Sequence, residues 1–279
     1  MANMTDKKVL TVQDISCVGQ CSLTVALPII SACGIETAIL PSAVLSTHTG
    51  GFSGFTFRDL TEDIPGIVAH WEKENIAFDA IYTGYLGSKR QIDLVKDMFK
   101  RLTVAGGLKI VDPAMADNGC LYPGFDAEFV DAMKTLCGEA DYLLPNITEA
   151  AFLTGLEYKT SYDRAYIDQL LSALTALGAK NIVLTGVSYA PGKTGVVVME
   201  NGNYQYYEHD RLGNSCHGTG DVYASAFVGS LMRGKTAFQS AKIAADYTVE
   251  CILETAKYDN HWYGVAFEPV LIKLIQALN

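Results

Sequence analysis

A regular alternation of short apolar runs with longer amphipathic runs limits this chain to few possible folds. The short runs have the length of strands, and the longer ones repeat apolar residues at the helical spacing of three to four. Predicted strands lie at residues 9–13, 37–41, 80–83, 109–111, 142–144 and 181–185, and predicted helices at residues 21–33, 64–74, 91–102, 127–136 and 167–177. Strand–helix alternation is typical of a parallel sheet covered by helices on both faces, with right-handed crossovers. We therefore predict a three-layer α/β/α fold with a mostly parallel central sheet.

The pattern changes after residue 194. Two strand-like runs, 195–200 and 204–209, are joined by Asn201-Gly202-Asn203, and Asn-Gly between strands is a strong hairpin signal. Three helical runs follow, at residues 221–233, 236–255 and 269–278. We predict a β-hairpin near residues 195–209, followed by a helical C-terminal part.

No internal repeat, low-complexity tract or linker interrupts the sequence. We therefore expect a single domain over residues 1–279, in which residues 1–7 form a flexible N-terminus. The Gly-rich, aromatic segment 47–58 is expected to be a flexible loop with a short strand, bordering a site.

Composition narrows the possible partners and location. The chain has 279 residues, of which 49% are hydrophobic, so an ample core can form. A net charge of −10 disfavours nucleic-acid binding, which needs a basic face. The N-terminus lacks an apolar signal core, and no apolar run approaches the ~20 residues of a spanning helix, so we expect no membrane segment. Seven cysteines without zinc-type spacing are typical of reduced thiols, which favours a cytoplasmic protein.

The most informative motif is Gly218-Thr219-Gly220-Asp221, which opens an apolar helical run. Free backbone N–H groups at a helix start favour anions, because the helix dipole and the unpaired donors point the same way. A carboxylate beside such an anion site suits one task, which is to take a proton from a hydroxyl that attacks a phosphate. The alternative is an ordinary N-cap, in which Thr219 or Asp221 pairs with the helix donors.

Polar residues recur where the predicted strands end. They are Asp14, Gly84-Tyr85, Asp112, Asn146 and Thr185. In open α/β sheets ligands bind at the carboxyl ends of the strands, so these residues indicate one crevice. Each of them alone could be a turn former or a helix cap.

Two of these strand ends carry candidate metal ligands. Asn146 and Glu149 are three residues apart, so they share one side of a helix start and could hold Mg²⁺ near phosphates. The alternative is a helix N-terminus with Asn as the cap and Glu at its third position. Asp112 and Asp117 lie in one loop, and Asp112 is the better metal candidate because it directly follows the strand.

Other motifs argue against competing activities. The run from Gly186 to Thr194 resembles a phosphate-binding P-loop, but it has five residues between its glycines and leads into a strand. We predict an ordinary β–β connection there, although Lys193 could border a nucleotide. No Gly-x-Gly-x-x-Gly follows the first strand and no Gly-x-Ser-x-Gly occurs, which disfavours a dehydrogenase and an α/β-hydrolase.

Three further residues flank the candidate loops. We expect His48 and His217 to form hydrogen bonds in these loops rather than to act in catalysis. Cys216 precedes the Gly218 loop, where a helix N-terminus could lower the pKa of its thiol. A nucleophilic cysteine would also need a base, and the sequence indicates none.

Together these residues resemble the ribokinase-like superfamily, and within it the pyridoxal kinase branch. The resemblance covers almost the whole chain. Its motifs are Gly218–Asp221, Asn146-Ile-Thr-Glu149, Asp112-Pro-Ala-Met-Ala-Asp117, Thr83-Gly-Tyr-Leu-Gly-Ser88 and Ser46-Thr-His-Thr-Gly50. The last two look like the branch's Ser-Gly-Tyr-Leu-Gly-Ser segment and Asn-His-Thr loop, which separate it from sugar kinases.

The resemblance implies ATP-dependent phosphorylation of the 5′-hydroxymethyl group of pyridoxal, pyridoxine or pyridoxamine. Asp221 would be the general base, and the backbone N–H groups of Gly218, Thr219 and Gly220 would form the anion hole. Such a reaction is an in-line phosphoryl transfer that depends on positioning and charge stabilisation.

The resemblance also implies which residues bind ATP and which bind Mg²⁺. Thr185, Thr219 and Asn146 would bind ATP, and Asp112 and Glu149 would organise Mg²⁺. The family is typically dimeric and often activated by K⁺, so a homodimer and a K⁺ dependence are expected.

On the ring side, Thr49 and Tyr85 are implied to contact the pyridine. The first strand ends in Gln13-Asp14-Ile15, where the family usually has Gln-Ser-His. A carboxylate at Asp14 could bind the ring nitrogen or the 3-hydroxyl, or it could select another substrate. The alternatives are therefore a kinase for a related ring alcohol such as hydroxymethylpyrimidine, and a non-catalytic vitamin B6-binding protein.

Overall fold

The central feature of the computed structural model, which describes residues 6–213 and 216–279, is one sheet of nine strands. Its strands are β1 (Lys8–Ser16), β2 (Glu36–Leu45), β3 (Phe57–Asp59), β4 (Phe78–Thr83), β5 (Thr103–Val111), β8 (Tyr142–Leu143), β9 (Asn181–Val187), β10 (Lys193–Glu200) and β11 (Asn203–Asp210). Their order is β11-β10-β9-β8-β5-β4-β1-β2-β3. The strands from β9 to β2 run parallel, whereas β10, β11 and β3 are antiparallel to their neighbours.

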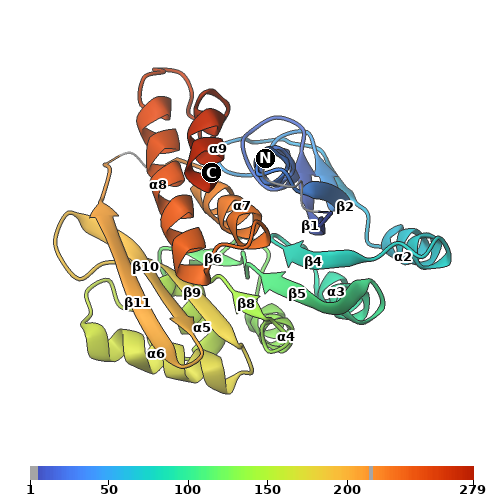
Figure 1. Ribbon diagram of the computed structural model, residues 1–279, viewed down its shortest axis with the longest axis horizontal. Coiled ribbons are helices and arrows are strands. Elements are labelled where there is room, and N and C mark those ends of the chain that lie inside the picture. Colours follow the sequence, from blue (N-terminus) through green and yellow to red (C-terminus); the bar gives the residue numbers. More distant parts are fainter. Residues whose placement is uncertain (1–5, 214–215) are drawn as a thin grey trace.

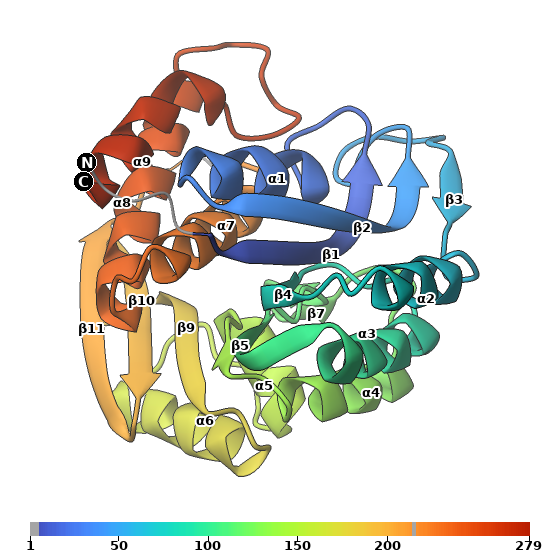
Figure 2. The same ribbon diagram turned by 45° about the vertical axis from the view of Figure 1, so that its right-hand side comes forward.

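Helices cover both faces of this sheet (Figures 1 and 2). One layer contains α1 (Leu23–Ala32), α7 (Thr219–Met232), α8 (Ala237–Thr255) and α9 (Leu271–Leu278), which follows the short 3₁₀ helix η1 (Glu268–Val270). The other layer contains α2 (Ile64–Lys73), α3 (Lys89–Arg101), α4 (Ala127–Cys137), α5 (Ile147–Thr154) and α6 (Arg164–Ala176). The predicted three-layer fold is confirmed.

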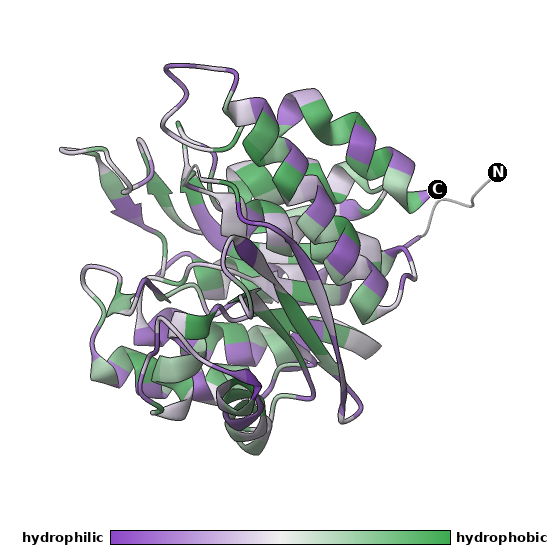
Figure 3. Cartoon of the chain, turned by 90° about the vertical axis from the view of Figure 1, so that its left-hand side faces the viewer, coloured by the Kyte–Doolittle hydropathy of each residue, from purple (hydrophilic) through white to green (hydrophobic). Residues whose placement is uncertain are grey.

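Two clusters of buried apolar residues lie one on each side of the sheet, and the apolar residues of the strands and helices are coloured green in Figure 3. Strand β1 contributes to both layers, because Val9 packs with the α1–α7–α8 side and Leu10 and Val12 pack with the α2–α6 side. A strand buried on both faces carries a nearly continuous apolar run, and this explains the strong sequence signal of β1. The part of the chain that the structure describes contains no helix long and apolar enough to cross a membrane.

Capping side chains fix where several helices begin. Ser88, Asp126 and Asp163 accept hydrogen bonds from the backbone N–H at the third position of α3, α4 and α6, respectively. Strand β5 is longer than predicted, since it begins at Thr103 rather than at residue 109. Its first residues are largely exposed and include two glycines, so they lack the apolar pattern from which strands are predicted.

Two connections bear on the site. The segment between β9 and β10 joins antiparallel strands, which confirms a β–β connection in place of a P-loop. A small hairpin of β6 (Ala116–Asp117) and β7 (Cys120–Leu121) was not predicted. Its turn residues Asn118 and Gly119 both have positive φ, as a tight hairpin turn requires. Of the N-terminal segment predicted to be flexible, residues 1–5 lie outside the described residues.

Candidate active site

The residues predicted to form one site come together at the carboxyl ends of the parallel strands. The Asp112 N–H donates to the Thr83 carbonyl over 2.9 Å, so the ends of β5 and β4 lie side by side. Asn146 and Thr185 form a parallel bridge beyond β8 and within β9. Asp14, near the end of β1, lies close enough to Asp221 for its charge to raise the pKa of Asp221. Asp221 in turn lies close enough to Asp112 for its charge to raise the pKa of Asp112. The structure therefore gathers side chains from five strands and from α7.

Helix α7 begins without a side-chain cap. Its N-cap is Gly218, with φ of 80° and, among the described residues, no capping hydrogen bond from a side chain. The Thr219 hydroxyl instead donates to the Cys216 carbonyl over 3.4 Å, so the alternative of an ordinary side-chain N-cap is wrong. A Cβ at Gly218 would lie 1.8 Å from the Gln20 carbonyl oxygen, so only glycine fits. The first N–H groups of α7 are thereby left for an anion.

Asp221 lies on the first turn of α7 and is half-buried. Burial, together with the charge of Asp14, raises the pKa of its carboxyl to about 7, while the Ser22 backbone N–H acts in the opposite direction. A carboxyl with such a pKa changes protonation state near neutrality, which is the property that a general base requires.

Asp14 lies near the end of β1, and Tyr85 follows the neighbouring strand β4. Asp14 is 5% exposed and accepts a hydrogen bond from the Ser16 hydroxyl over 3.1 Å. Burial raises the pKa of Asp14, and the Ser22 and Ser16 hydroxyls act in the opposite direction. Burial raises the pKa of the Tyr85 phenol, and the charge of Asp14 acts in the same direction.

His48 has a structural role in the loop after β2. Its Nε2 lies 2.7 Å from the Tyr263 carbonyl oxygen, and its Nδ1 accepts the Gly50 N–H over 3.0 Å. These partners require a neutral ring with the proton on Nε2, since Nδ1 must accept. The His217 ring lies 5.3 Å away between centroids, and burial lowers its pKa. Thr49 follows His48 with an exposed side chain.

Asn146 and Glu149 form the capping box that the sequence left as an alternative. The Asn146 side-chain oxygen and the Glu149 carboxylate each accept the other's backbone N–H over 2.9 Å. The second Glu149 oxygen accepts the Met115 N–H over 3.2 Å. Glu149 is thereby fixed and only 3% exposed.

Buried carboxyl groups gather beside this capping box. Burial raises the pKa of Asp112 well above its ordinary value, and the charges of Glu149 and Asp221 raise it further. Burial likewise raises the pKa of Glu149. Within residues 6–213 and 216–279, no three His, Cys, Asp or Glu side chains come together to hold a metal ion. Asp117 is exposed and accepts the Asn118 N–H over 2.8 Å, as a turn residue does.

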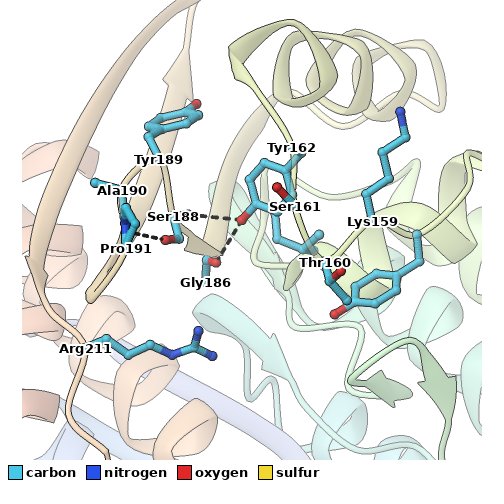
Figure 4. Close-up of a pocket in the computed structure, with 12 residues that line it drawn as sticks. Lys159, Thr160, Ser161, Tyr162, Gly186, Ser188, Tyr189, Ala190, Pro191 and Arg211 are labelled. Carbon is cyan, nitrogen blue, oxygen red and sulfur yellow. Dashed lines mark hydrogen bonds between the residues drawn. The ribbon is translucent and has the colours of Figure 1, made fainter.

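A pocket of about 330 Å³ adjoins Asn146 and Thr185 (Figure 4). It opens between residues 158–162 and 186–191, with Arg211 at its edge. The Tyr162 hydroxyl accepts the Ser188 N–H over 3.0 Å and donates to the Gly186 carbonyl over 3.3 Å.

Two cations, Lys159 and Arg211, line this pocket. Sequence reasoning missed both of them, because they lie in segments far apart in the chain and carry no motif. It considered Lys193 instead, which forms an ion pair with Asp210 over 2.7 Å.

All seven cysteines are free. Burial raises the pKa of the Cys216 thiol. The direction is opposite to the lowering that a helix N-terminus could produce, because burial disfavours the charged thiolate.

Comparison with known proteins gives the family. The sequence profile described as Phosphomethylpyrimidine kinase matches residues 43–266. A Bacteroides thetaiotaomicron protein, provisionally named phosphomethylpyrimidine kinase and crystallised with pyridoxal, is 38% identical, with 96% of this chain and 95% of that chain covered and a TM-score of 0.91. Pyridoxal kinase from Lactobacillus plantarum is 33% identical, with 98% of each chain covered and a TM-score of 0.90.

A more distant structure shares the fold. Pyridoxal kinase from Leishmania donovani, solved with ADP and pyridoxamine, is 19% identical, covers 96% of each chain and has a TM-score of 0.83. The profile match and the two closer structures support the same conclusion as the motifs. This chain belongs to the phosphomethylpyrimidine kinase family, a ribokinase-like family of kinases whose relatives include pyridoxal kinases.

Proposed function

We propose that this protein is an ATP-dependent pyridoxal kinase that phosphorylates the 5′-hydroxymethyl group of pyridoxal, pyridoxine and pyridoxamine. One observation carries the proposal, which is the carboxyl of Asp221 on the first turn of a helix whose N-terminus has a glycine cap. A base and an anion site are then adjacent, as transfer of a phosphoryl group to an alcohol requires.

In the proposed reaction Asp221 accepts the proton of the 5′-hydroxyl. The hydroxyl oxygen forms a bond to the γ-phosphorus of ATP, and the bond from that phosphorus to the β–γ bridging oxygen breaks. The N–H groups of Gly218, Thr219 and Gly220 stabilise the negative charge on the transferring group. Because the pKa of Asp221 is raised to about 7, the carboxylate is a stronger base than an exposed aspartate.

The ring would lie between Asp14 and the aromatic face of Tyr85, with Thr49 from the neighbouring loop as a third contact. A buried carboxylate at Asp14 can accept a hydrogen bond from a protonated ring nitrogen or from the 3-hydroxyl. The likeness to the Bacteroides thetaiotaomicron protein crystallised with pyridoxal supports this ring identity.

The nucleotide would lie on the other side of Asp221, along Asn146, Thr185 and Thr219. The adjoining pocket with Lys159 and Arg211 supplies positive charge to a chain whose net charge is −10. The Leishmania donovani structure with ADP supports ATP as the phosphate donor.

Asp112 and Glu149 would hold Mg²⁺. Their hard oxygen atoms suit this ion, which is usually bound by one or two carboxylates together with waters and substrate phosphates. When bound, Mg²⁺ neutralises charge on the phosphates. The remaining expectations of the sequence, which are K⁺ activation, a homodimer, a single domain and a cytoplasmic location, are part of the same proposal.

A kinase assay on a panel of alcohols tests the proposal. Purified protein with MgATP should phosphorylate pyridoxal, pyridoxine and pyridoxamine with higher kcat/KM than hydroxymethylpyrimidine. In Asp221→Asn we expect turnover to fall about 10²–10⁴-fold, with pyridoxal binding retained. Turnover of hydroxymethylpyrimidine alone would overturn the vitamin B6 assignment, and unchanged turnover in Asp221→Asn would exclude Asp221 as the base.

A hydroxymethylpyrimidine kinase is the second candidate. The observation that favours it is Asp14, which occupies a position where the pyridoxal kinases of this fold usually have serine. The same panel separates the two activities, because both substrates are assayed under identical conditions.

A further inference from the structure

Ser22 has a backbone conformation that serine rarely adopts. Its φ is 55° and its ψ is −131°, which are the angles of the first central residue of a type II′ turn, a position dominated by glycine. The other non-glycine residues with positive φ in the described part of the chain are Asn75, Asn118 and Asn201. Asparagine tolerates positive φ far better than serine does. Ser22 is therefore the strained exception.

The Ser22 hydroxyl does not cap its helix, although serine at an N-cap usually accepts a backbone N–H from the first turn. Ser22 is the N-cap of α1, and its carbonyl accepts the Val25 and Ala26 N–H groups over 3.0 and 2.9 Å. Its side chain makes no capping hydrogen bond within the described residues, in contrast to Ser88, whose hydroxyl caps α3. The side chain is 6% exposed, so its hydroxyl needs another partner.

Ser22 lies between two carboxylates. The Ile15–Ser22 bridge places Ser22 beside the end of β1, which carries Asp14, and the contact of Gln20 with Gly218 places the same loop against the start of α7, which carries Asp221. In keeping with this placement, the Ser22 hydroxyl lowers the pKa of Asp14 and the Ser22 backbone N–H lowers that of Asp221. The loop that carries it has little freedom, because Ser22 forms an antiparallel bridge with Ile15. The adjacent Gln20 carbonyl also packs directly against Gly218.

We propose that Ser22 is a positioning residue that sets the proposed ring-binding carboxyl of Asp14 and the proposed base Asp221 at a fixed separation, and that its strained backbone is retained for this purpose. The inference rests on the proposed function. A hydroxyl donor keeps Asp14 ionised and oriented, so that it can accept from the substrate ring. A fixed N–H holds one Asp221 oxygen, which leaves the other directed at the substrate hydroxyl. Strain at a site surrounded by catalytic groups is typical of such pre-organisation.

Two substitutions distinguish a positioning role of Ser22 from a strained backbone that the fold merely tolerates. Ser22→Ala removes the hydroxyl and keeps the strained backbone, whereas Ser22→Gly removes the hydroxyl and relieves the strain. We expect the KM for pyridoxal to rise about tenfold in Ser22→Ala, with kcat within about threefold of wild type. We expect Ser22→Gly to have a higher Tm than wild type, yet a raised KM and a lower kcat, because its N–H is no longer held.

Asn75→Gly is the matched control. It relieves a positive φ at an exposed residue beyond the end of α2, so it should leave KM and kcat unchanged. Wild-type KM and kcat in Ser22→Gly, combined with a higher Tm, would overturn the inference. So would an unchanged KM in Ser22→Ala, and if that variant does not fold, Ser22→Gly decides alone.

The failure of this inference and that of the proposed function look different. If wild type phosphorylates the vitamers and both Ser22 variants match it, only the positioning role is wrong. If wild type phosphorylates none of them, the proposed function fails, and the inference that depends on it fails as well.

Discussion

The Asn146 backbone N–H donates to the Glu149 carboxylate, and the Glu149 N–H donates back to the Asn146 side-chain oxygen, each over 2.9 Å. This reciprocal pair begins α5 at the edge of the candidate active site. It fixes the Glu149 side chain, whose charge acts on Asp112. One local motif thus both starts a helix and presents a carboxyl group to the proposed phosphate site.

The protein contains a second capping box, which allows a matched test. Thr236 and Gln239 form it at the start of α8, where both are exposed. We expect Glu149→Ala to lower the free energy of unfolding by about 2 kcal/mol, because it leaves the N–H groups of half-buried Asn146 and buried Met115 without an acceptor. Gln239→Ala should cost less than about 1 kcal/mol, since water replaces the lost acceptor. Chemical denaturation measures both, and equal losses would contradict the structural reason.

The pH dependence of kcat/KM should report the ionisation of Asp221. A base must be ionised to act, and the pKa of this carboxyl is raised to about 7. We therefore expect kcat/KM to fall tenfold per pH unit below about pH 7. Asp14→Asn removes a charge that raises the pKa of Asp221. In this variant the fall of kcat/KM should therefore begin at a lower pH than in wild type, even though kcat/KM is lower at every pH. If kcat/KM of wild type falls only near pH 4, the assignment of this ionisation to Asp221 would be contradicted.

Binding of MgADP should release protons. The pKa of Asp112 is raised well above its ordinary value, which favours the protonated carboxyl, and a bound cation would displace that proton. Calorimetry at pH 7 in two buffers with different ionisation enthalpies measures that release. We expect less release in Asp112→Asn and no change in Asp117→Asn, which alters an exposed carboxylate on β6. Equal proton release in all three proteins would contradict a role for Asp112 in holding Mg²⁺.

Two neighbouring glycines should respond differently to alanine. At Gly218 the new Cβ would lie 1.8 Å from the Gln20 carbonyl oxygen at a positive φ, so Gly218→Ala should cost about 2 kcal/mol or more. At Gly220 nothing lies within 4 Å, so Gly220→Ala should fold at least as stably as wild type. Its methyl group would nevertheless enter the space proposed for the phosphoryl group, and kcat should fall. Full activity in Gly220→Ala would argue against an anion hole there.

Much of the fold follows from local sequence. The periodicity of apolar residues located the strands and helices, and Asn201-Gly202 located the β10–β11 hairpin. The strand ends also identified the crevice, because parallel strands present their carboxyl ends along one edge. The β6–β7 hairpin was missed although its Asn118-Gly119 turn has the same signal, since strands of two residues show no periodicity.

The sequence by itself determined the layers of the fold, the glycine loop that starts α7 and the list of carboxylates at the strand ends. Each depends on neighbours in the chain, through hydrophobic periodicity, helix capping and turn geometry. Only the tertiary structure decided which carboxylates act on one another and that Ser22 lies between Asp14 and Asp221. It also brought Lys159 and Arg211 to one pocket. Burial and the distance between charges set these properties, and both depend on residues that are far apart in the chain.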